Sequence, residues 1–305
     1  VTTDLGGFYT LSGLVEGGTY TVTPTRGAFV FTPASQAFPN LQHDEVAAFF
    51  VAQVGTFTRY FAEGATGSFF DTQFALLNAT GQPATATVRF QQITGAEVAT
   101  TVSLGGLQRV SIDPKALGLT NAEFSTVIEA TQPIVADRTM TWDAGRYGSH
   151  AETSIGRPLP QWFLAEGATI DGFDLFYLVQ NANDSAVDVE VRYLRRAGDP
   201  LTKHYTVGPR SRFNIWVNHE DPGLADAEVS AVVTASAPVI VERAMYRPVG
   251  AQTFGAGHAS AGVEAPALAW YFAEGATGDF FDLFFLVANA TPETAMLEAR
   301  YLLPD

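Results

Sequence analysis

One sequence motif occurs three times in this chain, at intervals as long as whole domains. The copies read YFAEGATGSFFDTQFALLNAT from Tyr60, WFLAEGATIDGFDLFYLVQNAN from Trp162 and WYFAEGATGDFFDLFFLVANAT from Trp270. The glutamates of AEGAT are separated by 103 and then 108 residues. A solenoid unit has roughly 20–50 residues, so this period predicts one domain per copy.

The residues after each motif alternate in steps of two, which indicates strands with one buried face. In the second copy, Phe173, Leu175, Tyr177 and Val179 share one parity. Further strands are expected at 97–104, 107–112, 124–131 and 133–142, with short helical turns only at 113–119 and 219–226. The spacing of turn residues between these strands is typical of sandwiches. The predicted fold is all-β, with tandem Ig-like antiparallel β-sandwich modules arranged as a rod.

The first 53 residues have a different pattern of short strands broken by Gly and Pro. They contain D-x-x-G-x-Y-x-x-x-G-L from Asp4, then GGTYTVTP and FTPASQ. This segment resembles the end of a carboxypeptidase-regulatory-like or Cna-B-type module, a small β-sandwich common on bacterial surface proteins. Some members of that family carry a Lys–Asn isopeptide crosslink. The segment has no Lys, so the crosslink is not expected here.

The WYFAEGATG-type copies resemble a bacterial family of unknown function that occurs in large secreted proteins of many modules. This resemblance covers residues 57–305 and implies an extracellular or cell-surface location, with no catalytic residues to transfer. The expected modules are a partial Cna-B-like module at 1–53, complete modules at 57–156 and 161–262, and a partial one at 269–305. Short linkers are expected near 54–57, 156–161 and 262–269.

Charge and cysteine content exclude several classes of function. The chain has 17 basic and 32 acidic side chains, a formal net charge of −15, so it would repel a phosphate backbone or an anionic membrane. No apolar run approaches the roughly 20 residues that span a bilayer. The absence of Cys removes disulfides, Cys-bound zinc and thiol nucleophiles. We therefore expect no nucleic-acid partner, no membrane insertion and no cofactor.

Paired carboxylates are the first candidates for chemistry. Each AEGAT glutamate precedes an aspartate by eight residues, and such pairs could serve a glycosidase or hold calcium. An array rarely needs identical active sites in tandem, so recurrence in every module favours a structural polar network instead. The calcium candidates are Glu63, Asp71, Glu166, Asp174, Glu274 and Asp282.

Two arginines are predicted to point into the sandwich cores. Arg138 and Arg243 share the parity of the apolar residues on their strands. A buried guanidinium keeps its charge and needs a carboxylate with fixed geometry. We expect structural ion pairs of Glu63 with Arg138 and of Glu166 with Arg243.

Histidines and serines do not form a recognisable catalytic pattern. His150 and His258 have Ser149 and Ser260 nearby, but they fall in Gly-rich segments assigned between modules, and the chain has no G-x-S-x-G elbow. No close His pair suggests a metal site. His219, beside Glu220 and Asp221, is expected in a solvated turn. N-x-[ST] sequons occur at Asn78, Asn183 and Asn289, and their glycosylation is left open.

The sequence points to an architectural role without catalysis. We expect a bacterial surface or filament protein that serves in spacing, adhesion or assembly. Open strand edges at both ends would pair with neighbouring modules or identical subunits. The alternative is a carbohydrate-binding stalk of a larger secreted hydrolase, in which exposed aromatic side chains contact cell-surface carbohydrate.

Overall fold

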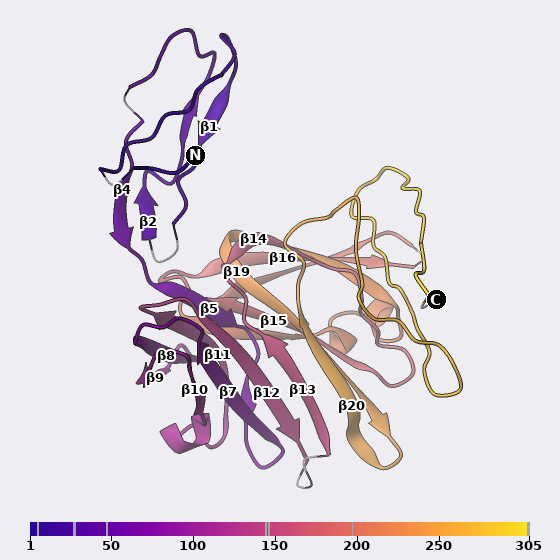
Figure 1. Ribbon diagram of the computed structural model, residues 1–305. Coiled ribbons are helices and arrows are strands. Elements are labelled where there is room, and N and C mark those ends of the chain that lie inside the picture. Colours follow the sequence, from indigo (N-terminus) through magenta and orange to yellow (C-terminus); the bar gives the residue numbers. More distant parts are fainter. Residues whose placement is uncertain are drawn as a thin grey trace.

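The protein is almost entirely β-structure (Figure 1). The computed structural model describes residues 1–4, 6–26, 29–46, 48–143, 145, 147–196 and 198–303. Helical structure in this part of the chain is limited to the 3₁₀ turns η1 (Pro114–Leu117), η2 (Val217–His219) and η3 (Pro222–Leu224). None of its helices is long and apolar enough to cross a membrane. The expected all-β fold of antiparallel sandwiches is confirmed.

The first sandwich packs two antiparallel sheets over residues 57–153. One sheet has the order β5-β11-β8-β9 and the other β10-β7-β12-β13, while the short β6 pairs with β11. The strands are β5 (Phe57–Phe61), β6 (Ala65–Thr66), β7 (Phe70–Asn78), β8 (Ala84–Gln92), β9 (Glu97–Leu104), β10 (Gln108–Ile112), β11 (Ala122–Ala130), β12 (Ile134–Trp142) and β13 (Gly148–Thr153). The four strands expected after residue 96 are therefore present, displaced by at most two residues at their ends.

The second sandwich repeats this strand order over residues 159–261. Its strands are β14 (Leu159–Leu164), β15 (Asp174–Asn181), β16 (Val187–Arg195), β17 (Leu201–Val207), β18 (Ser211–Trp216), β19 (Val229–Val249) and β20 (Gln252–Ala261). The first half of β19 pairs with β14 and β16, and its second half pairs with β15 and β20. The long strand β19 thus takes the places of both β11 and β12.

Side chains alternate along β15 and along its counterpart β7, so each of these strands buries the face that points into its own sandwich. Leu175, Tyr177 and Val179 are fully buried in the core of the second sandwich. Phe74 and Leu76 of β7 hold the same places in the first sandwich. The predicted parity of these strands is observed in both.

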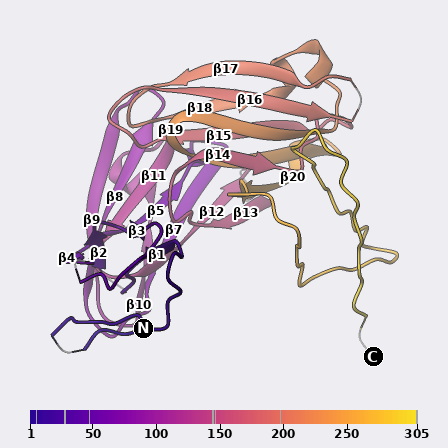
Figure 2. The same ribbon diagram turned by 90° about the horizontal axis from the view of Figure 1, so that it is seen from above.

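The two sandwiches pack directly on each other. Strands of the second sandwich run across those of the first in Figure 2. One apolar cluster extends over both, because Ala62, Trp142 and Ile155 belong to the same buried core as Leu178 and Ala244. The outer face of β15 and β19 therefore covers one end of the first sandwich.

The N-terminal segment contains strands but no packed core. β1 (Tyr20–Val22) pairs with β3 (Gln36–Phe38), and β2 (Phe29–Thr32) pairs with β4 (Val51–Val54). No described side chain of residues 1–52 is buried, and the segment lies apart from the sandwiches in Figure 1. Strands of three or four residues bury too little apolar surface to make the expected partial sandwich a packed unit.

The C-terminal segment differs from expectation. We predicted a partial β-sandwich module at 269–305, whose last two residues lie outside the described part, but residues 264–303 contain no strand. In the second sandwich, β15 is held by hydrogen bonds to β18 and β19. Residues 264–303 include no counterpart of these two partners, so the segment cannot pair in that way.

Candidate functional site

The AEGAT motif forms a corner that closes each sandwich. A Cβ atom on Gly64 would lie 2.5 Å from the Phe124 ring, so only glycine fits there. The Thr66 hydroxyl donates to the Leu119 carbonyl at 2.5 Å, and Thr169 donates to the Leu224 carbonyl at 2.6 Å. The glycine and the threonine of the motif therefore have structural roles.

The glutamate of the motif reaches the predicted arginine in both sandwiches. Arg138 Nη2 lies 3.0 Å from Glu63 Oε2, and Arg243 Nη2 lies 2.7 Å from Glu166 Oε2. In each pair, Nη1 of the arginine also donates to the main-chain carbonyl of the same glutamate, at 2.9 Å. The structure brings together all four residues proposed as structural ion pairs.

A third charged residue, which the sequence analysis missed, completes the first pair. Arg138 Nη1 lies 2.5 Å from Oε2 of Glu242, which belongs to the second sandwich. The Glu242 carboxylate also accepts hydrogen bonds from the main-chain N–H groups of Ala62 and Glu63, at 3.0 and 3.1 Å. Arg138 and Glu242 are both inaccessible to solvent. A carboxylate of one sandwich is thus fully enclosed by the corner of the other.

An aromatic residue and a histidine extend this buried network. Tyr246 donates its hydroxyl proton to Glu63 Oε1 at 3.0 Å, and its oxygen lies 3.1 Å from His150 Nε2. Burial raises the pKa of Tyr246 well above its ordinary value and lowers the pKa of His150. Burial alone would lower the pKa of Arg138, but the charges of Glu242 and Glu63 raise it. These five residues are named the inter-sandwich network below.

A second buried arginine joins the sandwiches beside this network. Arg212 Nη1 donates to the main-chain carbonyls of Gly64 at 2.6 Å and Phe124 at 3.1 Å. Its neighbour Asn214 donates to Glu123 Oε2 at 2.7 Å. Burial lowers the pKa of Arg212, and the charge of Glu123 opposes this.

The second sandwich carries the same group in a more open state. His258 Nε2 lies 3.7 Å from Glu166 Oε1, just as His150 Nε2 lies 3.6 Å from Glu63 Oε2. The side chains of Glu166 and His258 are 32% and 44% exposed, against 6% and 4% for Glu63 and His150. Among the described residues, no second acid forms an ion pair with Arg243, and burial lowers its pKa.

The histidine positions correct an expectation. His150 and His258 lie on β13 and β20, the last strands of the sandwiches, rather than between modules. Gly148 is the first residue of β13. A glycine is needed there because the Trp142 ring occupies the position that a Cβ of Gly148 would fill. Ser149 is next to His150 on β13, so its side chain points to the opposite face, whereas Ser260 is two residues after His258 on β20 and shares its face.

The calcium candidates do not converge. Glu63 and Glu166 are paired with arginines, Asp71 lies 3.4 Å from Lys115, and Asp174 accepts from Trp216 Nε1 at 3.0 Å. Glu274 and Asp282 are exposed in the segment without strands. Within the described residues, no group of three or more His, Asp or Glu side chains could hold a metal ion.

The sequon asparagines Asn78 and Asn183 hold loops through side-chain hydrogen bonds to main-chain carbonyls. Asn78 is fully buried, and its amide nitrogen donates to the carbonyls of Gln82 and Gly105 at 2.7 and 2.9 Å. Asn183 is half-buried and donates to Pro238 O at 2.9 Å, while Asn289 is exposed.

His219 is exposed in the 3₁₀ turn η2, in agreement with the expected solvated turn. The two acids that follow it are held by neighbouring strands, because Tyr205 donates to Glu220 at 2.6 Å and Lys203 pairs with Asp221 at 3.0 Å.

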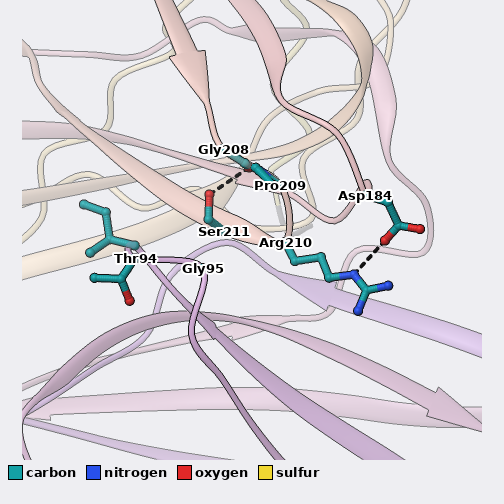
Figure 3. Close-up of a pocket in the computed structure, with 8 residues that line it drawn as sticks. Thr94, Gly95, Asp184, Gly208, Pro209, Arg210 and Ser211 are labelled. Atoms are coloured by element: carbon teal, nitrogen blue, oxygen red, sulfur yellow. Dashed lines mark hydrogen bonds and ion pairs between the residues drawn. The ribbon is translucent and has the colours of Figure 1, made fainter.

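A surface groove of about 540 Å³ lies where loops of the two sandwiches meet (Figure 3). Thr94 and Gly95 line one side of it, and Pro209 and Arg210 line the other. Among the described residues that line this groove, the charged side chains are Arg210 and Asp184, and they pair with each other, with Arg210 Nε 2.6 Å from Asp184 Oδ1. The groove therefore presents little polar chemistry to a ligand beyond main-chain groups.

Comparison with known proteins assigns no family. No family model and no curated protein matches the chain. The similar solved structures include one titled Crystal Structure of Thermotoga maritima 1070, with a TM-score of 0.32, 13% identity, and coverage of 35% of this chain and 94% of that one. Another is an Anabaena sensory rhodopsin transducer, with a TM-score of 0.25, 25% identity, and coverage of 29% and 96%.

Proposed function

We propose that this chain is a non-catalytic structural segment of a bacterial surface or filament protein, in which the sandwiches act as a rigid spacer. The observation that carries this proposal is the inter-sandwich network. It joins residues of both sandwiches through groups that no substrate can reach, since Arg138 and Glu242 are fully buried. Its role is therefore to fix one domain against another.

The inter-sandwich network fixes the orientation of the two sandwiches more than it adds to the free energy of unfolding. A buried ion pair gives little net stabilisation, because desolvation offsets its Coulomb energy, but a misplaced buried charge is very costly. The Glu242 carboxylate finds three donors only at the corner formed by Ala62, Glu63 and Arg138. Any other orientation of the second sandwich would separate Glu242 from these donors and leave Arg138 with Glu63 alone. The network thus favours one fixed geometry, as a spacer requires.

The rigid coupling can be tested by small-angle scattering on the full chain and on Glu242→Gln. The spacer proposal expects one compact two-sandwich shape for the unaltered chain and a broader distribution of dimensions for the variant. A flexible unaltered chain would contradict it. The location is tested separately, by immunogold labelling of native cells with an antibody against the sandwiches. Label confined to the cytosol would refute a surface role.

Carbohydrate binding is a second candidate, favoured by one exposed indole. Trp216 is 42% exposed, and its ring lies 5.4 Å from that of Phe176 and 4.2 Å from that of His219. An indole face beside polar groups can stack on a sugar. Titration calorimetry with cell-wall oligosaccharides tests this function, with Trp216→Ala as the variant. Binding that the substitution abolishes would favour the stalk over the spacer.

A further inference from the structure

The face that β15 presents to the first sandwich has a counterpart later in the chain. β15 directs Phe176, Leu178 and Gln180 outward from its own core. Leu178 is paired with Glu242 on one side and Asn214 on the other, and both of these contact the first sandwich. Leu178 is 3% exposed, so the first sandwich covers it.

The residues at these outward positions are large and apolar in the second and third copies of the motif but not in the first. The strand reads FDLFYLVQN at 173–181 and FDLFFLVAN at 281–289, so Phe284 and Leu286 stand where Phe176 and Leu178 stand. The first copy reads FDTQFALLN, with Gln73 and Ala75 at these places. In the described part of the chain, no other sandwich covers the outer face of β7, where Leu77 is 40% exposed. The copy whose strand packs on another sandwich therefore has apolar outward residues, and the third copy has apolar residues at the same two positions.

The second sandwich has a corner that corresponds to the corner of the first on which β15 docks, and we call each such corner a docking seat. Glu166, Arg243 and His258 repeat the geometry of Glu63, Arg138 and His150, yet they remain partly exposed. Within the described residues, Arg243 pairs with Glu166 and with no second carboxylate of the kind that Glu242 gives to Arg138. The seat departs from the first at more than one position, because Arg247 stands in place of Trp142 and Leu194 stands in place of Gln91.

The chain leaves both sandwiches along the same path. Ile155 forms a β-bridge with Tyr60 after the first sandwich, and Val263 forms a β-bridge with Phe163 after the second. The segment that follows Val263 therefore starts from the same place on the second sandwich as β14 does on the first. It already touches β16, because Arg192 Nη2 donates to the Ala290 carbonyl at 3.2 Å.

From these relationships we infer that the corner around Glu166, Arg243 and His258 is the docking seat of the segment 267–303. The segment docks with Phe284 and Leu286 facing the second sandwich, as β15 docks with Phe176 and Leu178. The occupant is this segment rather than a second copy, because the outer face that another copy's first sandwich would offer carries Gln73 and Ala75. This inference deepens the proposed spacer role, because it extends the same contact to the next unit.

A distance test follows from the first interface, where Gln180 Nε2 lies 3.4 Å from Gln91 Oε1. The corresponding residues are Ala288 and Leu194. The chain has no Cys, so Leu194→Cys with Ala288→Cys gives a unique pair for a short thiol-to-thiol crosslinker. Gln91→Cys with Gln180→Cys is the positive control. Leu77→Cys, on the exposed outer face of the first sandwich, with Ala288→Cys is the negative control.

We expect the 194–288 crosslink in monomers, at a yield several-fold above that of the negative control. Adding Phe284→Gln and Leu286→Ala, which copy the first sandwich, should lower the yield several-fold, whereas Phe285→Tyr, which copies inner residue Tyr177, should not. Crosslinks found only in dimers would overturn the inference and assign the seat to a second copy. A yield no higher than that of the negative control would also overturn it. The crosslink does not depend on where the protein resides, so it can fail while the surface role holds.

Discussion

The Arg138 guanidinium is bound by Glu242, a residue 104 positions later in the chain and in a different sandwich. Glu63 from the first sandwich binds the same guanidinium at 3.0 Å. One buried cation therefore has two carboxylates, each from a different domain. The two sandwiches are thus joined by a buried charge cluster as well as by the covalent linker and the shared apolar core.

Replacing Glu242 by Gln should uncouple the two sandwiches. Both carboxylate oxygens accept main-chain N–H groups, so an amide would turn one acceptor into a donor and leave Arg138 with Glu63 alone. Removing one partner of a buried ion pair costs about 3–5 kcal/mol. Chemical denaturation followed by circular dichroism should show a lower midpoint and separate transitions.

Asp137→Asn is the matched control for this change. Asp137 holds the position on β12 that Glu242 holds on β19, but it is exposed, and the hydrogen bond that it accepts from the described side chains comes from Thr153 Oγ1, at 2.9 Å. Its substitution should alter stability by no more than about 0.5 kcal/mol. Equal effects of the two substitutions would show that the inter-sandwich network does not couple the domains.

The two motif glutamates should differ in their contribution to stability. Glu63→Gln weakens a pair that is almost fully buried, so we expect a loss of about 3–5 kcal/mol. Glu166→Gln weakens the same pair with 32% of its acid exposed, so water compensates and the loss should be about 1 kcal/mol or less. Urea unfolding of both variants measures the difference, and a larger loss at Glu166 would contradict the prediction.

Glu152 should make the protein more stable as the medium becomes mildly acidic. Burial, and then the charge of Glu242, raises the pKa of Glu152 from 4.5 to about 7. The folded state therefore binds more protons than the unfolded state between these values, and this contribution to stability falls as the pH rises from 4.5 to 7. Glu152→Gln should remove this slope and stabilise the protein above pH 7.

His150 opposes this trend, so the measurement must separate the two groups. Burial lowers the pKa of His150, and its contribution to stability is lost as the pH falls below the unfolded value of 6.5. Unfolding free energies at several pH values should be compared for the unaltered protein, Glu152→Gln and His150→Gln. An unchanged slope in Glu152→Gln would rule out the assignment.

The alternation of residues along each strand predicted the contacts that form inside one sandwich. The parity of Arg138 and Arg243 located both ion pairs, because a strand turns every second side chain inward. The same reasoning places Glu242 on the outward face, next to Arg243, and so it fails to predict the burial of Glu242. Only the packing of the second sandwich on the first makes that outward face an interior.

A difference between copies could have revealed the contact. Phe176 and Leu178 are apolar on the outward face of a strand that is also apolar inward, whereas the first copy has Gln73 and Ala75 there. A strand that is apolar on both faces is typically buried on both. The corners of the motif could not be predicted, since the roles of Gly64 and Thr66 depend on neighbours about 55–60 residues away in sequence.

Asn78 should remain unmodified even in a cell that glycosylates sequons. Its amide nitrogen is buried and already donates to two carbonyls, so a glycan could attach only if the loop opened. Asn78→Ala should leave these acceptors unpaired and cost about 1–3 kcal/mol. Mass spectrometry of the native protein checks the first expectation and thermal unfolding the second. A glycan on Asn78 would show that its hydrogen bonds to these two carbonyls form late or not at all.

Gly64→Ala tests whether the motif is a packing device. The added methyl group would meet the Phe124 ring at 2.5 Å and the Phe124 carbonyl at 2.9 Å, so the corner would have to move. That carbonyl and the Gly64 carbonyl both accept from Arg212, so the shift would also disturb the contact with the second sandwich. Overpacking of this kind costs about 1–3 kcal/mol. Gly81→Ala, with no atom within 4 Å of the new Cβ, should leave the unfolding midpoint unchanged, and an equal effect of both substitutions would argue against a packing role for the motif glycine.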